Sequence, residues 1–172
     1  MNIIFLDVDG VLNSTAYYEH NKKIGRKVLE IADYHLQKLA EIYHTCDAKI
    51  VLSSTWRELD DSDNDTCSAM YQYLVDELAR YDMKIMSKTP LINNNRPLEI
   101  KTWLDNRVDK DEIRFVSLDD DFSKDKYDAY GIGDCLVKTK FFCRELSEGG
   151  LQQEHVDKAI GILSRWKKWI IF

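Results

Sequence analysis

Short apolar runs alternate along the chain with longer segments in which apolar residues recur every three or four positions. The short runs are rich in β-branched residues and predict strands at 3–6, 48–52, 83–86, 113–118 and 135–139. The longer segments predict helices over 34–45, 70–81, 96–108 and 156–163. This alternation is typical of an α/β protein, so we expect a three-layer αβα, Rossmann-like fold with a central, mostly parallel sheet.

Polar residues follow three of the predicted strands at the point where each strand ends. Asp7 comes directly after Leu6, Ser53 and Ser54 follow Leu52, and Asp119 follows Leu118. Ligands of parallel α/β sheets bind beyond the carboxyl ends of the strands. We therefore expect these side chains to meet at one edge of the sheet and to form a site.

Asp7 and Asp9 are the most informative pair in the chain. Side chains two positions apart leave a strand on the same face, so the two carboxylates should converge, and Gly10 allows the backbone to turn away behind them. Neighbouring carboxylates repel each other unless a cation or a shared proton lies between them. Mg²⁺ prefers oxygen ligands of this kind and is the expected partner.

The segment DVDGVLN at 7–13 resembles the first motif of the haloacid dehalogenase (HAD) superfamily, whose members are mostly phosphohydrolases. The resemblance implies that Asp7 is the nucleophile that attacks phosphorus and that Asp9 is the general acid and base. It also implies a Mg²⁺ site formed by Asp7, the backbone carbonyl of Asp9, and Asp119.

Two further motifs of this superfamily bind the phosphoryl group. The resemblance favours Ser54 over Ser53 in VLSSTWR as the hydroxyl that contacts phosphate. Arg96, in RPLEIKTWL, matches the cation of the third motif, and Lys88 is the rival for that role. Arg57 could reach a substrate phosphate or simply lie solvated at a helix start.

The fourth motif is an acidic pair, which FVSLDDDF matches. The resemblance implies that Asp119 is a direct metal ligand and that Asp120 is a second or water-mediated one. Asp121 is expected to be a surface or capping residue. Asp134, in GIGD, is a competing acid, but no apolar strand precedes it.

The end of the chain, with LVKT and GLQQEHVDKAIGIL, is similar to a HAD subgroup labelled after "Swiss Army Knife" RNA repair proteins. We expect one domain over 1–172, in which 14–33 is too short for a cap and forms a minimal flap. By analogy with capless HAD enzymes, an open site suits a large phosphorylated substrate: a nucleic-acid end, a phosphoprotein or a nucleotide.

The composition limits which binding partners and which cellular compartment are expected. The net charge of −6 over 172 residues argues against broad non-specific binding to nucleic acid, although it permits a local basic patch. No transmembrane segment or secretory signal is predicted, and the four cysteines lack metal-binding spacing. We therefore expect a cytoplasmic protein with reduced thiols and no membrane partner, and the sequence leaves the oligomeric state open.

An acidic loop and the apolar end of the chain carry no site prediction. Asp61, Asp63 and Asp65 have the spacing of a calcium-binding loop, but Thr66 and Gln72 replace its glycine and glutamate, so a solvated loop is expected. The apolar ending SRWKKWIIF is expected to pack on the core, with a dimer or membrane-surface contact as alternatives.

The motifs together predict a Mg²⁺-dependent phosphatase that works through an aspartyl-phosphate. A phosphotransferase that uses the same nucleophile is the first alternative. A non-catalytic binding module on a HAD scaffold is the second, and the presence of Asp7, Asp9, Arg96 and Asp119 together counts against it.

Overall fold

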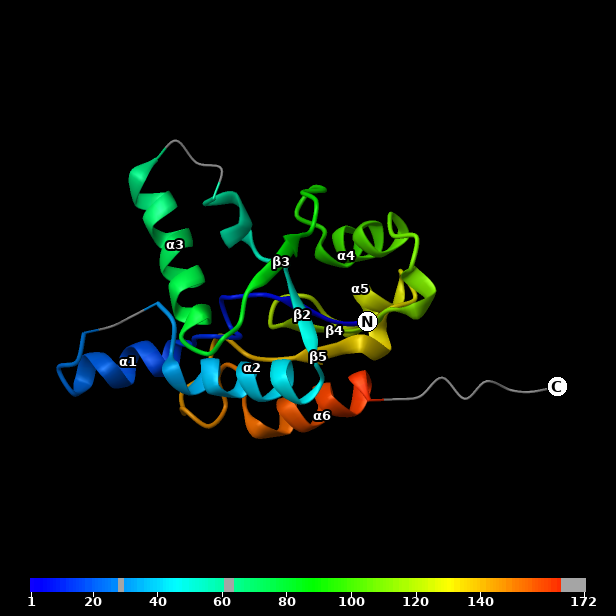
Figure 1. Cartoon of the computed structure of the whole chain (residues 1–172). Helices are drawn as coiled ribbons and strands as arrows, with labels where there is room; N and C mark the ends of the chain where they lie inside the picture. The colour runs from blue at the N-terminus through cyan, green and yellow to red at the C-terminus, as the bar shows by residue number, and fades with distance from the viewer. Residues whose placement is uncertain (28–29, 61–63, 165–172) are drawn as a thin grey trace.

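A five-stranded parallel sheet forms the centre of the molecule in a computed structural model that describes residues 1–27, 30–60 and 64–164 (Figure 1). The strand order is β3-β2-β1-β4-β5. The strands are β1 (Asn2–Leu6), β2 (Ala48–Leu52), β3 (Ile85–Lys88), β4 (Arg114–Asp119) and β5 (Leu136–Lys138). The helices are α1 (Thr15–Lys23), α2 (Asp33–Thr45), α3 (Asp65–Ala79), α4 (Arg96–Asp105), α5 (Lys124–Asp128) and α6 (Gln153–Leu163).

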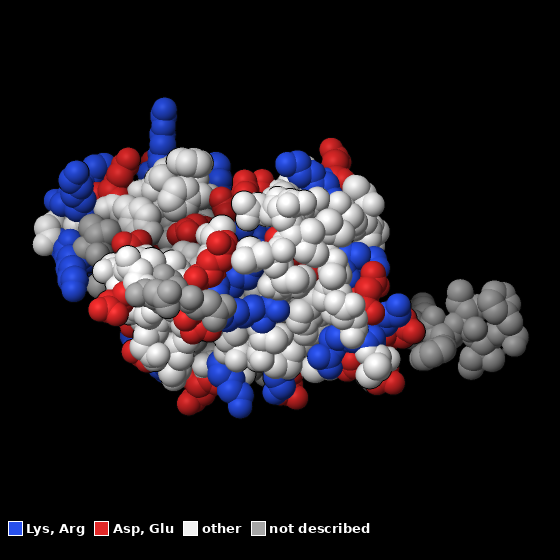
Figure 2. Space-filling view, turned by 90° about the horizontal axis from the view of Figure 1, so that it is seen from above, with Lys and Arg blue, Asp and Glu red and all other residues white. Residues whose placement is uncertain are grey.

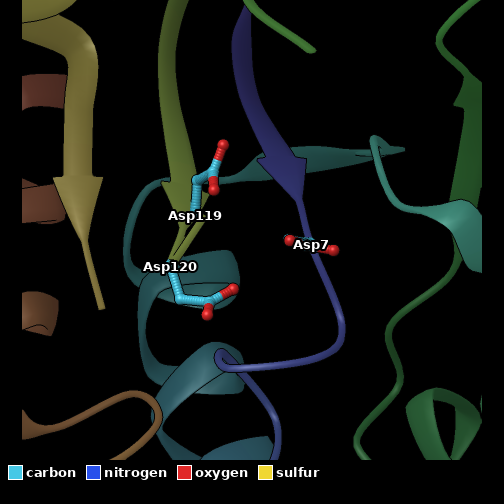
Figure 3. Close-up of side chains that lie close together, drawn as sticks. All are labelled: Asp7, Asp119 and Asp120. Carbon is cyan, nitrogen blue, oxygen red and sulfur yellow. The ribbon is translucent and has the colours of Figure 1, made fainter. Parts of the chain in front are cut away.

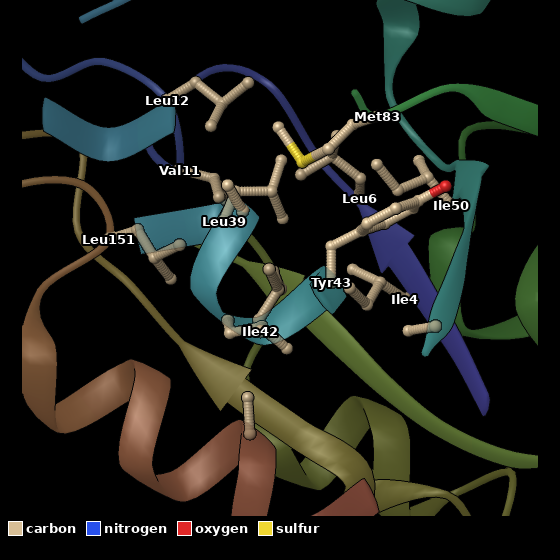
Figure 4. Packing of buried hydrophobic residues seen from close by; sticks show 14 of the residues in the cluster. Ile4, Leu6, Val11, Leu12, Leu39, Ile42, Tyr43, Ile50, Met83 and Leu151 are labelled. Carbon is tan, nitrogen blue, oxygen red and sulfur yellow. The ribbon is translucent and has the colours of Figure 1, made fainter. Parts of the chain in front are cut away.

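Side chains of β1 alternate between two apolar layers, one on each face of the sheet. Ile4 and Leu6 are fully buried in a cluster with residues of α2, α3 and α6, part of which is shown in Figure 4. Ile3 and Phe5 are buried on the opposite face, in a cluster with residues of α4 and α5. Helices therefore cover both faces, and the predicted three-layer α/β fold is confirmed.

The register of the sheet sets the position of the site. Leu6 of β1 pairs with Leu52 of β2 and with Leu118 of β4, so the three strands end at the same level. The chain passes from β1 to β2 on one side and reaches β4 on the other, so the strand order reverses beside β1. Ligands of open α/β sheets bind at such a reversal, outside the carboxyl ends of the strands.

Several predicted elements have other bounds in the structure, among them the helix expected over 70–81, which is α3 and begins five residues earlier, at Asp65. The strand expected at 83–86 is β3 at Ile85–Lys88, because Asp82 is in the left-handed region with a φ of 54° and Met83 is buried in the core before the strand begins. The helix expected to reach Val108 ends at Asp105, and Val108 is fully exposed.

The sequence did not predict α1 or the short α5. Helix α1 is largely polar, so its apolar periodicity is weak, and Ser14 begins it by accepting a hydrogen bond from the Tyr17 N–H. It lies within the segment 14–33, where a minimal flap was expected; residues 28–29 of that segment are not described. The carboxylates of Asp61 and Asp63 and the apolar ending at 165–172 also lie outside the described residues.

No described helix has the length and apolar character needed to cross a membrane. The face shown in Figure 2 carries acidic and basic side chains intermixed, with basic side chains gathered at the end where α1 lies. On this face, any basic surface for an anionic partner is therefore local.

Candidate active site

The carboxylate of Asp7 is buried at the carboxyl end of β1, the central strand. Its backbone N–H continues the sheet by donating to the Leu118 carbonyl at 3.1 Å. The side chain accepts hydrogen bonds from the Val8 N–H at 2.9 Å, from the Ser54 hydroxyl and from the Arg96 guanidinium. The sheet thus fixes the backbone, and three donors fix the carboxylate.

Asp119 and Asp120 lie beside Asp7 (Figure 3). Oxygen atoms of the three carboxylates come within 4.8 Å of one another, and no other acidic group this close is found among the described residues. Burial, and then the charge of Asp119, raises the pKa of Asp120 to about 6. Burial raises the pKa of Asp7 to about 7 although Arg96 opposes the shift. Both shifts follow from gathering negative charge away from water.

Asp119 is fully buried and accepts hydrogen bonds on both oxygens. Its Oδ1 accepts the N–H groups of Asp121 at 2.7 Å and Phe122 at 3.1 Å, and Arg96 Nη1 lies 3.0 Å away. Its Oδ2 accepts from the Tyr127 hydroxyl at 2.6 Å. Burial and Asp119 raise the pKa of Tyr127 well above its ordinary value, so this phenol keeps its proton and remains a donor.

The carboxylate of Asp9 does not join this cluster. Its Oδ2 accepts from the Trp56 indole N–H at 3.0 Å, and its Oδ1 accepts from the Asn13 amide at 2.9 Å. Asn13 is itself buried and also accepts from the Gly10 N–H at 2.9 Å. Asp9 is exposed to solvent but is held in one orientation by two side chains whose roles the sequence analysis did not foresee.

Gly10 is required by space as well as by backbone conformation. Its φ is +73°, and a Cβ built there would lie 2.1 Å from Cγ of Asp120. The loop after β1 therefore packs directly against Asp120, which follows β4. A side chain at position 10 would displace the Asp120 carboxylate from the cluster.

The two serines after β2 point in different directions. The Ser54 hydroxyl hydrogen-bonds to Asp7, whereas the Ser53 hydroxyl lies 3.5 Å from the Thr89 hydroxyl, between β2 and the end of β3. Both are fully buried. Ser54 is thus the serine that the fold brings to the cluster.

Of the two rival cations, Arg96 lies at the cluster and Lys88 does not. Arg96 begins α4, and contacts both Asp7 and Asp119. Lys88 ends β3, two strands away from β1, and its Nζ binds the Asp60 carboxylate and the Arg57 carbonyl. Of the two, Arg96 is therefore the cation that the fold brings to the acidic cluster.

Arg57 is neither solvated nor free to bind substrate. It is only 4% exposed and forms an ion pair with Glu99 of α4, with Nη2 at 2.8 Å from Oε2. Its Nη1 also donates to the Ser54 carbonyl at 3.0 Å, and Glu99 Oε1 accepts the Ile92 N–H at 2.8 Å. This buried pair connects the serine turn to the helix that carries Arg96.

The remaining acidic candidates lie outside the cluster. Asp121 is exposed, and its contribution is the backbone N–H that it donates to Asp119. Asp134 is exposed in a short turn before β5, where its carboxylate lies 3.4 Å from Lys124. Neither side chain belongs to the acidic group around Asp7.

The donor set fits a hard divalent cation. Asp7, Asp119 and Asp120 supply carboxylate oxygens only, and no soft ligand joins them among the described residues. The raised pKa values of Asp7 and Asp120 indicate that a further positive charge beside Arg96 would be favourable. The Asp9 carboxylate is directed to Trp56 and Asn13. Asp9 would therefore bind the cation through its backbone carbonyl.

The fold and the acidic cluster define a HAD-type protein, a class of hydrolases and phosphatases. The family model described as "HAD domain in Swiss Army Knife RNA repair proteins" matches residues 3–156. The chain belongs to this family, as its motifs predicted. Comparisons with curated proteins and with solved structures found no match.

Proposed function

We propose that this protein is a Mg²⁺-dependent phosphohydrolase that works through an aspartyl-phosphate on Asp7. The observation that carries the proposal is the buried Asp7 carboxylate, which lies between Arg96 and Ser54 with Asp119 and Asp120 beside it. Family membership supports hydrolase chemistry, and the arrangement supports a phosphate as the group attacked.

In the proposed first step, one Asp7 oxygen attacks phosphorus while the bond from phosphorus to the leaving oxygen breaks. Asp9 donates its proton to that leaving oxygen. In the second step, Asp9 accepts a proton from water, and the water oxygen attacks phosphorus and releases Asp7 and inorganic phosphate. Trp56 and Asn13 hold the Asp9 carboxylate in place for both transfers.

Arg96 and Ser54 would bind the non-bridging oxygens of the phosphoryl group, since both already donate to Asp7. Catalysis would then depend mainly on positioning and electrostatics. A Mg²⁺ ion held by Asp7, Asp119, Asp120 and the Asp9 carbonyl would neutralise charge between nucleophile and substrate when bound. Tyr127 would keep Asp119 oriented toward the cluster.

The test is release of para-nitrophenol from para-nitrophenyl phosphate, with Mg²⁺ or with EDTA. We expect Mg²⁺-dependent turnover that Asp7→Asn abolishes and that the exposed control Asp121→Asn retains. Acid-quenched phosphoenzyme should be detected in the wild type and not in Asp7→Asn. Turnover by Asp7→Asn at the wild-type rate would refute the nucleophile assignment.

Product analysis separates the alternatives. Transfer of phosphate to an added alcohol in preference to water would indicate a phosphotransferase. Absence of turnover together with no effect of Mg²⁺ on the melting temperature would indicate a binding module.

A further inference from the structure

The ion pair between Arg57 and Glu99 places two full charges in the interior of the protein. Both side chains are almost completely buried, and Nη2 of Arg57 lies 2.8 Å from Oε2 of Glu99. The Nε atom of Arg57 is also buried and has no hydrogen-bond partner among the described residues. Replacing a buried ion pair by apolar side chains of similar volume is often neutral or stabilising. Stability alone therefore does not explain why this position holds a pair of charges.

Arg57 ends a short turn that supplies hydrogen bonds to both proposed catalytic aspartates. The Ser54 hydroxyl donates to Asp7, and the Trp56 indole N–H donates to Asp9 at 3.0 Å. The backbone N–H of Arg57 donates to the Ser54 carbonyl at 3.1 Å, and its Nη1 donates to the same carbonyl at 3.0 Å. One arm of the guanidinium therefore closes this turn, and the other arm is left for an acid on a different element.

That acid, Glu99, belongs to the helix that carries the cation of the acidic cluster. It lies on α4 three residues after Arg96. Its Oε2 binds Arg57, and its Oε1 accepts the Ile92 N–H at 2.8 Å, so it also fixes the loop that leads into α4. The ion pair thus joins the start of α4 to the turn after β2, which are the elements that carry Arg96 and Ser54.

The geometry of the pair suits it to setting a distance between two elements. A guanidinium is planar, and its N–H groups point in fixed directions, so a side chain with both arms engaged has one orientation. Neither Arg57 nor Glu99 belongs to the acidic group around Asp7. Any effect of the pair on the site must therefore pass through Ser54 and Arg96.

We propose that Arg57 and Glu99 are positioning residues that hold Ser54 and Arg96 at the spacing needed to bind the phosphoryl oxygens beside Asp7. The inference rests on the proposed phosphatase and goes beyond it by assigning a role to a pair that touches no reacting atom. A displacement of about 1 Å caused by a change far from the chemistry can lower a rate about 100-fold.

Replacing both members of the pair separates positioning from stability. Arg57→Met combined with Glu99→Leu removes both charges and keeps apolar volume, so the fold should remain stable while the turn and α4 lose their fixed spacing. We measure hydrolysis of para-nitrophenyl phosphate with Mg²⁺, and we measure binding of inorganic phosphate by calorimetric titration. We expect kcat/KM to fall about 100-fold and the Kd of phosphate to rise about tenfold. The affinity for Mg²⁺ should change less than the affinity for phosphate.

A conservative variant gives the same test with the buried charges still paired. Arg57→Lys keeps a cation beside Glu99 but lacks the second arm that reaches the Ser54 carbonyl, so it should lower kcat/KM about tenfold. The matched control is Arg107→Met combined with Asp109→Leu, which removes another arginine–carboxylate pair, beyond the end of α4. We expect this control to keep the wild-type kcat/KM.

A double variant as active as the control would overturn the proposal, as would Arg57→Lys with the wild-type kcat/KM. Equal losses of affinity for phosphate and for Mg²⁺ would also overturn it, because they would indicate damage to the whole site. The wild type tests the phosphatase separately. If it hydrolyses the ester and the double variant matches it, only the positioning role is refuted. A wild type that neither hydrolyses the ester nor binds phosphate would refute the proposed function and this inference together.

Discussion

Replacing the proposed nucleophile Asp7 by asparagine should make the metal-free protein more stable while abolishing its activity. Burial raises the pKa of Asp7 from 3.8 to about 7 in the folded chain. Between these two values the folded state binds a proton that the unfolded state has released. The free energy of unfolding therefore falls as the pH rises from about 4 to about 7, and the loss is complete above pH 7.

The magnitude follows from the size of the shift. Each pKa unit corresponds to about 1.36 kcal/mol, so a shift of about three units corresponds to roughly 4 kcal/mol of lost stability at pH 8. This figure already includes the opposing attraction of Arg96, which is part of the net shift. Asparagine has nearly the same shape without the charge, so Asp7→Asn should recover up to about 4 kcal/mol.

Thermal unfolding in EDTA at pH 8 and pH 5 measures the effect. Each kcal/mol raises Tm by about 2–4 °C for a chain of this size. We expect Asp7→Asn to melt up to about 8–16 °C above the wild type at pH 8, and by less than half of that at pH 5, where the shift of Asp7 corresponds to about 1.6 kcal/mol. Mg²⁺ should stabilise the wild type and Asp121→Asn but not Asp7→Asn. The exposed Asp121→Asn is the control, and an Asp7→Asn protein no more stable than the wild type at pH 8 would refute the reasoning.

Three further predictions concern the surroundings of the site. Gly10→Ala should abolish the Mg²⁺-dependent rise in Tm and cost about 1–2 kcal/mol of stability in urea unfolding, because its Cβ meets Asp120 and its φ is positive; a normal Mg²⁺ response would contradict this. Glu99→Gln should lower the free energy of unfolding by about 3–5 kcal/mol, because it leaves Arg57 charged and buried. Arg57→Met combined with Glu99→Leu should restore most of this lost stability. A double variant less stable than Glu99→Gln would argue against a charge effect. Burial lowers the pKa of His35, so its contribution to stability is present above pH 6.5 and is lost below that pH, opposite in sign to the contribution of Asp7 over the same range. The free energy of unfolding of the wild type relative to His35→Gln should therefore fall between pH 7 and pH 5; a difference that does not change with pH would exclude a contribution from His35.

The fold class and the family could be predicted because both depend on local patterns. Short β-branched runs and helical periodicity specify the order of elements, and DVDGVLN carries the family resemblance in seven consecutive residues. The errors occurred where local patterns are weak. Polar α1 has little periodicity, and Val108 matched a helical period beyond the end of α4 by coincidence.

The sequence also located the residues that gather at the site, because parallel strands end at one edge. It could not locate the partners that orient them. Trp56 reaches Asp9 across 47 positions, and Arg57 reaches Glu99 across 42. Such contacts depend on how turns and helices pack over the sheet, and single residues at these separations leave no pattern in one sequence. The catalytic and metal-binding roles remain predictions.

Strands β1, β2 and β4 end at the same level, and this restricts where residues can be inserted or deleted in the domain. Leu6, Leu52 and Leu118 form the last paired row, and Asp7, Ser53 and Asp119 follow it. Inserting or deleting one residue in any of these strands would shift its polar end by about 3.3 Å and turn it to the other face of the sheet. Surface loops can therefore lengthen or shorten during evolution, whereas the lengths of these three strands are constrained.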